Sequence, residues 1–218
     1  MSTSADELPR CWPASDPLYV AYHDDEWGRP VTTEQGIYER LCLEGFQSGL
    51  SWLTILRKRE NFRSAFAGFD PEAVARFGKR DVERLLGDAG IVRHRGKIEA
   101  AIANARGVLE LRTEGTPLHE LVWAHAPETY EAPRTTADWQ AQTPESKALS
   151  KRLKSAGFRF VGPTTLWAGM QACGVVNDHL TTCWVREAVQ RDLEAVTTRA
   201  ASSVARSPSG TASRRGAP

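Results

Sequence analysis

The sequence contains no apolar run of about 18 residues, the length that a membrane-spanning helix would need. Its first residues, MSTSADELPR, include acids and a proline where a secretory signal needs a basic start and an apolar segment. We therefore expect a cytoplasmic protein with no membrane partner. The apolar content of 41% and the charged content of 25% are those of an ordinary globular protein that folds unaided.

Cysteine is scarce, with four residues at positions 11, 42, 173 and 183. Without a secretion signal, so few cysteines fit reduced thiols or metal ligands better than a disulfide framework. Cys42 and Cys173 fall on apolar helical stripes, where they are expected to be small core residues. The net charge of +1 excludes no class of partner, because a nucleic-acid enzyme needs only a local basic face.

Strict alternation of apolar and polar residues, the pattern of a half-buried strand, is nearly absent. Apolar residues instead recur every three or four positions, as at Ile37 and Leu41 and within residues 98–109. Asp70 and Thr143 each precede a proline, which is the arrangement of a helix cap followed by the first helical residue. These patterns predict an all-α fold.

The two ends of the chain differ in composition from the rest. Residues 196–218 contain four arginines, no acids and no aromatics, and we interpret them as a disordered basic tail. Residues 1–9 are expected to be frayed. Residues 10–192 then form one compact helical domain, within which two lobes are conceivable.

Glu44 continues the stripe of Ile37 and Leu41, so a helix would direct it toward the core. An unpaired buried carboxylate is costly, and we expect Glu44 to pair, to take up a proton or to meet a ligand. One alternative is that Glu44 ends its helix and reaches solvent beyond GFQSG. Trp52, across a glycine-flanked turn, favours a ligand, since a carboxylate beside an indole suits a flat, positively charged ring.

His179 and Cys183 in NDHLTTC are four residues apart, and in a helical segment both could contact one metal ion. Cys11 and His23 near the other end could complete a Cys2His2 set suited to Zn²⁺. Four protein ligands leave no position for water, so this site would be structural and would join the two ends of the domain. The spacing alone leaves open that Cys183 is a buried apolar residue and that both histidines only form hydrogen bonds.

Zinc with histidine, cysteine and glutamate also occurs in nucleobase deaminases. Their H-x-E and P-C-x-x-C signatures are missing from this sequence, which argues against that class.

Residues 149–174 predict a helix that ends at Gly157, a short link, and a second helix that begins at Pro163. The exposed amides around Gly162, Thr164 and Thr165 would suit a DNA phosphate. Hairpins of this kind are also common in helical proteins that do not bind DNA. A second candidate for a backbone contact is the glycine-rich, basic segment 85–98.

Several motifs in order, DPLYVAYHDDEWG, CLEGFQSGLSW, RKRENFR, DAGIVRHRGKI, GFRFVGPTT and MQACGVVNDH, resemble the 3-methyladenine DNA glycosylase I family of bacterial alkylation-repair enzymes. The resemblance extends from about Arg10 to about Cys183.

The resemblance implies a helix-hairpin-helix glycosylase fold with a zinc clamp between N- and C-terminal segments. It places the base pocket at Glu44, Tyr22 and Trp52, with Trp27 and Trp12 nearby. The implied zinc ligands are the set already suspected from spacing: Cys11, His23, His179 and Cys183.

Two departures from related patterns bear on function. The superfamily positions of a hairpin lysine and a later aspartate hold Thr164 and Asn177, so no Schiff base and no strand cleavage are expected. Cys11 and Trp12 are adjacent where the family has one residue between them. This shorter spacing predicts that either Cys11 reaches the metal and Trp12 turns away, or the converse.

The function implied by the resemblance is that of a monofunctional DNA glycosylase, which flips 3-methyladenine out of alkylated double-stranded DNA and excises it by hydrolysis. We expect a monomer with one structural Zn²⁺. The alternative is a non-catalytic, zinc-stabilised DNA-binding module.

Overall fold

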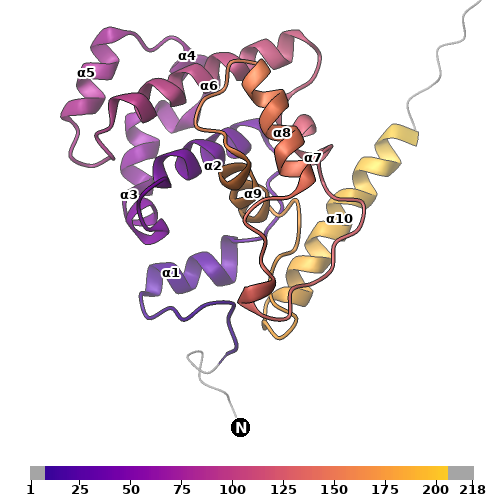
Figure 1. Cartoon of the computed structure of the whole chain (residues 1–218). Coiled ribbons are helices and arrows are strands. Elements are labelled where there is room, and N and C mark those ends of the chain that lie inside the picture. The colour runs from indigo at the N-terminus through magenta and orange to yellow at the C-terminus, as the bar shows by residue number, and fades with distance from the viewer. Residues whose placement is uncertain (1–7, 206–218) are drawn as a thin grey trace, which may run out of the picture.

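The computed structural model describes residues 8–205, with side chains for residues 8–198. Within this range every regular element is a helix and there is no strand, which confirms the all-α prediction (Figure 1). The α-helices are α1 (Pro17–Ala21), α2 (Glu34–Gln47), α3 (Trp52–Ala65), α4 (Pro71–Ala75), α5 (Lys79–Gly87), α6 (Arg95–Thr113), α7 (Leu118–Trp123), α8 (Pro144–Ser155), α9 (Pro163–Ala172) and α10 (Arg186–Ala205). A π-helical turn, η2 (Tyr22–Glu26), and two 3-10 turns, η3 (Ala67–Phe69) and η4 (Thr136–Asp138), complete the set.

Local sequence signals begin several of these helices. The side chains of Asp70 and Thr143 accept hydrogen bonds from backbone amides two and three residues later, as their positions before proline predicted. Thr33 and Ser51 cap α2 and α3 in the same way. Ser51 therefore begins α3 at the corner between Glu44 and Trp52, whereas Thr33 begins α2 at the end far from that corner.

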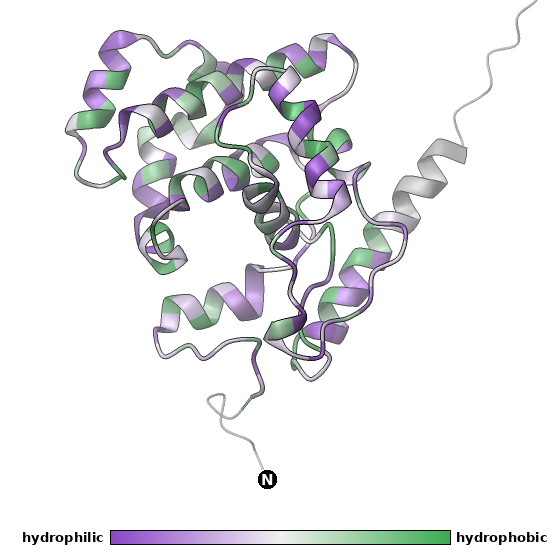
Figure 2. Cartoon of the chain, viewed as in Figure 1, coloured by the Kyte–Doolittle hydropathy of each residue, from purple (hydrophilic) through white to green (hydrophobic). Residues whose placement is uncertain are grey.

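The larger hydrophobic core lies between α2 and the helices from α3 to α9. Helix α9 packs against α2 and α8, and α4 packs against α6. Gly169 allows this close approach, because a Cβ atom there would lie 2.9 Å from a methyl group of Leu41. Figure 2 shows the resulting pattern on α5 and α8, where hydrophilic and hydrophobic residues alternate along the turns.

A smaller hydrophobic cluster forms where the N-terminal segment meets the segment before α10. It contains Tyr22, Trp27, Leu180, Val185 and Val189, and the four predicted metal ligands lie among or beside them. Trp52 packs against both clusters. The boundary between the two clusters is the place where side chains of helical and irregular segments face one another.

The hairpin predicted around VGPTT is present. Helix α8 ends at Ser155, Gly157 adopts a φ of 82°, and α9 begins at Pro163 with Gly162 as its N-cap residue. Asn104 of α6 fixes the link by hydrogen bonds to the backbone of Arg159, and Ser150 donates to the carbonyl of Val161. The turn is thus held by side chains of two neighbouring helices.

One expectation about local structure is wrong, and one condition set for the metal site is not met. Helix α10 continues to Ala205, so residues 196–205 are helical where a disordered tail was predicted, and residues 206–218 lie outside the described part of the chain. The segment NDHLTTC is not helical but consists of bends and turns. His179 and Cys183 therefore approach each other through a turn, closed by the bond from the Cys183 amide to the Leu180 carbonyl.

The predicted frayed N-terminus falls mostly on residues outside the described range. Within that range, no helix is long and apolar enough to cross a membrane.

Candidate active site and metal cluster

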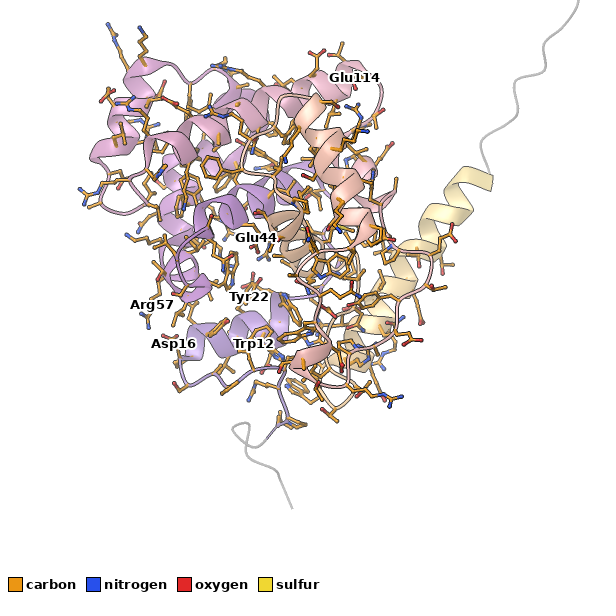
Figure 3. The ribbon with its side chains drawn as sticks, viewed as in Figure 1. Trp12, Asp16, Tyr22, Glu44, Arg57 and Glu114 are labelled. Atoms are coloured by element: carbon orange, nitrogen blue, oxygen red, sulfur yellow. The ribbon has the colours of Figure 1, made fainter. Side chains whose placement is uncertain are left out.

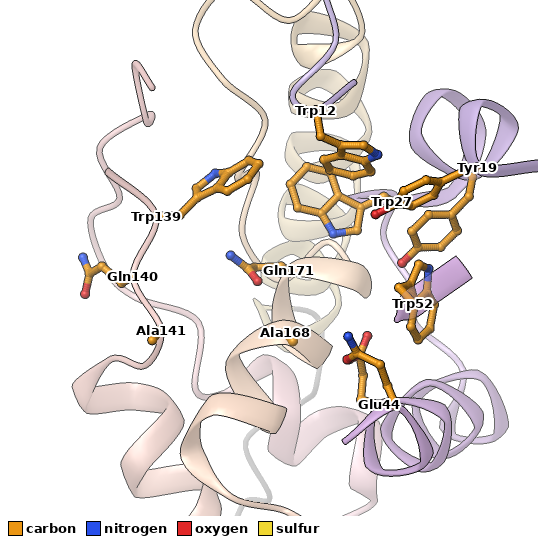
Figure 4. A pocket seen from close by; sticks show the side chains of 12 residues that line it. Trp12, Tyr19, Trp27, Glu44, Trp52, Trp139, Gln140, Ala141, Ala168 and Gln171 are labelled. Atoms are coloured by element: carbon orange, nitrogen blue, oxygen red, sulfur yellow. The ribbon is translucent and has the colours of Figure 1, made fainter. Parts of the chain in front are cut away.

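A cavity of about 490 Å³ opens at the boundary between the two hydrophobic clusters. This volume is in the usual range for a small-molecule site. Its lining is mostly aromatic, with four tryptophans and two tyrosines and a few polar groups (Figure 4). The lining residues are Trp12, Tyr19, Tyr22, Trp27, Glu44, Gln47, Trp52, Trp139, Gln140, Ala141, Ala168 and Gln171.

Glu44 is the acid of this cavity. It lies near the end of α2, is 6% exposed, and points toward the side chains of Trp27 and Trp52 (Figure 4). Burial raises the pKa of Glu44 to about 8 from an ordinary value of 4.5, and the charge of Arg40 opposes part of that rise. The interpretation in which Glu44 reaches solvent is therefore wrong, and this carboxyl group faces a cavity.

The aromatic residues predicted for the pocket are brought together around Glu44. Tyr22 faces it from the N-terminal segment, as Figure 3 shows, and its ring centroid lies 5.3 Å from that of Trp52. The rings of Trp12 and Trp27 meet edge to face, with centroids 4.9 Å apart. Flat side chains thus enclose the carboxyl group from several directions.

The π-helical turn η2 explains how YHDDE serves two purposes. Tyr22 and His23 are adjacent, yet Tyr22 lines the cavity while His23 joins the metal cluster. Both side chains are buried. Such wide turns are frequent at functional sites, and nothing in the residue types of this segment distinguished it from an ordinary helical turn.

Sequence reasoning missed Tyr19, Gln47, Trp139 and Gln171 as lining residues. Two of them carried a signal: Trp139 is a large aromatic in a polar loop, and Gln171 is the polar residue of the apolar helix α9.

Asp178 holds both of these residues in place. Its carboxylate accepts from the Gln171 amide and, at 2.5 Å, from the Tyr130 hydroxyl. Its backbone carbonyl accepts from the Trp139 indole at 3.0 Å. The part of the cavity that Trp139 and Gln171 line is therefore connected to the segment that carries His179.

The four predicted metal ligands form one buried cluster. Their ligand atoms all lie within 4.8 Å of one another, and they join the segment before α1 and the turn η2 to the segment before α10. Nδ1 of His179 lies 3.3 Å from Sγ of Cys11 and 3.4 Å from Sγ of Cys183. A tetrahedral ion with ordinary zinc bond lengths would place sulfur and nitrogen ligands roughly 3.5 Å apart. The spacing within the cluster fits such an ion.

The outer ring nitrogens of both histidines are also engaged. Nδ1 of His23 lies 2.7 Å from the Asp24 carboxylate, and Nε2 of His179 lies 3.0 Å from the Trp27 carbonyl. These acceptors place the proton on the outer nitrogen and leave the inner nitrogen unprotonated, as metal binding requires. Nε2 of His23, the inner nitrogen, accepts from the Cys11 amide at 3.2 Å. A hydrogen bond from the Cys11 thiol holds the pKa of Cys183 below its usual range, although burial opposes this shift, and the Cys183 thiolate is favoured.

The short spacing between Cys11 and Trp12 has a different outcome from either predicted alternative. Cys11 joins the metal cluster, and Trp12 lines the cavity. Cys11 and Trp12 lie at a bend of the chain, and the two adjacent side chains there serve different sites. The expectation that one of the two side chains must turn away is wrong.

The hairpin residues lie apart from the cavity lining. Gly162, Thr164 and Thr165 are at the start of α9, whereas Ala168 and Gln171, in its second half, line the cavity. A Cβ atom at Gly162 would meet open space, so the backbone there is accessible to a partner. Asn177 is buried and donates to the carbonyl of Arg186 and to Gln190, in a position away from the cavity lining.

The comparisons with known proteins all match the same family of enzymes. Residues 12–187 match the family described as methyladenine glycosylase. The chain is 51% identical over 180 residues to DNA-3-methyladenine glycosylase 1 of Escherichia coli (strain K12), a match that covers 81% of this chain and 96% of that protein.

Solved structures give the same result. A crystal structure of 3-methyladenine DNA glycosylase I superimposes with a TM-score of 0.78 at 48% identity, covering 81% of this chain and 98% of the other. A structure of 3-methyladenine DNA glycosylase I from Staphylococcus aureus, which describes recognition of 3-methyladenine, gives a TM-score of 0.76 at 34% identity and covers 79% and 93% of the two chains.

Proposed function

Because this chain belongs to the methyladenine glycosylase family, we propose that it is a monofunctional DNA glycosylase that excises 3-methyladenine from alkylated DNA. The reaction hydrolyses the bond between the damaged base and its sugar and begins base excision repair. The observation that carries the proposal is the buried Glu44 carboxyl group, which faces a cavity walled by aromatic rings.

Methylation at N3 gives the adenine ring a positive charge and weakens its bond to the sugar, because the base then leaves as a neutral molecule. Little acid catalysis is needed. The enzyme must extrude the base from the duplex, hold it, and stabilise the sugar cation as it forms. A mostly apolar cavity with one acidic group suits this task.

Glu44 supplies the charge that distinguishes the damaged base. A carboxylate about 4 Å from a cationic ring, at an effective dielectric constant near 20, favours it over a neutral ring by about 4 kcal/mol, which partial solvation reduces. This corresponds to roughly a thousandfold preference over ordinary adenine. Tyr22 and Trp52 supply two adjoining flat walls, with Trp12 and Trp27 completing the enclosure.

The charge state of Glu44 gives the reaction a pH dependence. With a pKa of about 8 in the free protein, Glu44 carries a proton in much of the population at neutral pH. A bound cation lowers that pKa, because an opposite charge favours the carboxylate. The rate of base release at limiting protein concentration is therefore expected to rise with pH up to about pH 8.

The amides around Gly162, Thr164 and Thr165 at the start of α9 bind a phosphate of the DNA backbone. The open space beside Gly162 supports this assignment. Because α9 also carries Ala168 and Gln171 to the cavity, one rigid helix connects the DNA contact with the base pocket. With Thr164 in the hairpin, no lysine is available there to form a Schiff base, and the activity is limited to base release.

The ion held by Cys11, His23, His179 and Cys183 is Zn²⁺, in a structural role. Two thiolates and two imidazoles are the donors that zinc prefers, and the set leaves no position for water. The protein is expected to act as a monomer.

The test is base release from alkylated double-stranded DNA, followed by chromatography of the released bases. Wild-type protein should release 3-methyladenine, and Glu44→Gln should release it about a thousandfold more slowly, since it keeps the size of the side chain and removes its charge. Glu39→Gln is a matched control on the same helix, because Glu39 pairs with Arg63 outside the cavity.

Unchanged release by Glu44→Gln would refute the role of Glu44. Binding of alkylated DNA by the wild type without any release would instead establish the alternative, a non-catalytic DNA-binding module.

A further inference from the structure

Arg40 is a buried cation on the helix that carries Glu44. It lies one turn before Glu44 on α2, and residues four apart on a helix are neighbours on its surface. Its side chain is 11% exposed. Arg40 does not itself line the cavity, so its charge acts on the site from behind the residues that do.

The partners of Arg40 explain how this charge is held. Its Nη2 donates to Glu26 at 3.0 Å, but Glu26 also accepts two hydrogen bonds from Arg59, at 2.6 and 2.9 Å. Nη1 of Arg40 is buried and has no hydrogen-bond partner among the described residues. Arg40 therefore shares the Glu26 carboxylate with the guanidinium of Arg59. The single negative charge of Glu26 does not neutralise both cations, so Arg40 retains part of its positive charge.

Tyr22 separates this charge from the cavity. Cζ of Arg40 lies 5.7 Å from the centroid of the Tyr22 ring, and that ring forms one wall of the pocket. A cationic base in the pocket thus meets the carboxyl group of Glu44 directly, with the phenol ring between the base and the guanidinium.

We propose that Arg40 is a positioning residue that favours the carboxylate form of Glu44, the form needed for base release. The inference rests on the proposed function of Glu44. Burial among apolar and aromatic groups raises the pKa of Glu44, and the charge of Arg40 opposes that rise. Without Arg40, no nearby cation would oppose it.

The other ionisable groups around Glu44 do not supply this charge. Tyr22 and Cys173 face it from η2 and the end of α9, and burial raises the pKa of both, so both are neutral. Tyr19 of α1 also lines the cavity, and burial raises its pKa.

The helices packed against α2 direct their charges elsewhere. Lys97 of α6 donates to the carbonyls of Phe46 and Ser48, and Arg59 of α3 is bonded to Glu26. The ionisable residues of α7, His119 and Glu120, follow Leu118, whose amide donates to Glu34 at the opposite end of α2.

The experiment measures base release from alkylated DNA between pH 5.5 and 9.5 for the wild type, Arg40→Met and Arg40→Lys. Arg40→Met should move the midpoint of the low-pH limb upward by about one pH unit, which slows release about tenfold at pH 6 and by only about a quarter at pH 9.5. Arg40→Lys keeps the charge and should retain the wild-type midpoint. Arg63→Met is the matched control, because Arg63 likewise forms an ion pair with a glutamate, Glu39 of α2, but its side chain is 38% exposed and lies outside the cavity.

A second variant tests the opposite direction and does not depend on the folding of Arg40→Met. Glu26→Gln removes the carboxylate that partly neutralises Arg40, so the midpoint should move downward. A uniform loss of rate at all pH values in both Arg40→Met and Glu26→Gln, with unmoved midpoints, would overturn the proposal and leave Arg40 a purely structural residue.

A titration of Glu44 followed by ¹³C NMR, with Glu44→Gln to assign the carboxyl signal, separates this proposal from the proposed function. If the wild type released no base but Arg40→Met still raised the Glu44 midpoint, the proposed function would fail and the electrostatic role of Arg40 would stand. If the Glu44 midpoint were the same with and without Arg40, the inference would fail whatever the activity.

Discussion

The cavity has two walls that are held in different ways. One wall consists of Glu44, Trp52 and Gln171, which project from helices α2, α3 and α9 of the larger hydrophobic core. The other wall consists of Trp12, Tyr22, Trp27 and Trp139, which project mainly from irregular segments beside the metal cluster. Helix packing positions the first wall, and polar contacts over long sequence separations position the second.

This difference shows how a segment with only short helical turns can be held in place. Residues 11–28 cannot bury a large apolar face of their own, but Cys11 and His23 are tied to the cluster, and the Trp27 carbonyl is held by His179. Four ligands and their outer contacts replace the many apolar contacts that hold a helix. Removing one group should therefore affect the irregular wall far more than the helical one.

The largest effect is expected from Cys183→Ser, which removes a thiolate ligand. Loss of an outer contact of a ligand typically costs ten- to a hundredfold in metal affinity, so loss of a ligand itself should cost about a thousandfold or more. Metal content and the midpoint of thermal unfolding should fall together. Cys42→Ala is the control, since Cys42 is equally buried but lies on α2 in the helical core.

Elemental analysis and calorimetry of both variants measure this effect. Retention of one zinc per chain in Cys183→Ser would eliminate the ligand set, and a loss of metal in Cys42→Ala would show that the two walls are not independent.

A smaller effect, of opposite sign, is expected on the helical wall from Glu44→Gln. Because folding raises the pKa of Glu44 from 4.5 to about 8, the folded state binds the proton more tightly than the unfolded chain. The stability contributed by the protonated form is complete below pH 4.5 and is lost as the pH rises to 8. Glutamine does not ionise, so the free energy of unfolding of the variant, relative to wild type, should increase by about 3 kcal/mol between pH 5.5 and 8.

Urea unfolding at both pH values measures this difference. Glu39→Gln, in which a carboxylate paired with Arg63 is lost, should show no such gain at pH 8. A Glu44→Gln variant with the same relative stability at both pH values would mean that Glu44 ionises freely in the folded protein.

The smallest of the three effects is expected from Asp24→Asn, which sharpens the comparison by changing an outer contact of the cluster. Asp24 lies 2.7 Å from His23 and also accepts from Arg10. Its loss should weaken metal binding ten- to a hundredfold while one metal ion is still bound at saturation. Competition with a chromophoric chelator measures this change, and an affinity equal to that of the wild type would show that Asp24 does not orient His23.

How far the sequence could predict this site differs between the walls. The spacing of Ile37, Leu41 and Glu44 predicted a buried carboxyl group on α2, and the prolines after Asp70 and Thr143 predicted where two helices begin. For the irregular wall, the spacing of His179 and Cys183 indicated two ligands, but the helix assumed between them is absent. The π-helical turn at Tyr22–Glu26 followed from no local pattern, and Trp139, although a large aromatic in a polar loop, carried no sign of which cavity it lines.

By itself, the sequence determined most of the helices, several of their caps, the place of Glu44 on the apolar stripe of its helix, and the residue types from which a metal site could be built. These are local properties, because helical period and capping depend on neighbours within a few residues. Only the tertiary structure brought Cys11 to His179, 168 positions along the chain, and placed Arg40 behind Tyr22. Contacts at such separations depend on how helices pack and on where irregular segments are tied, and both are settled only when the whole chain is folded.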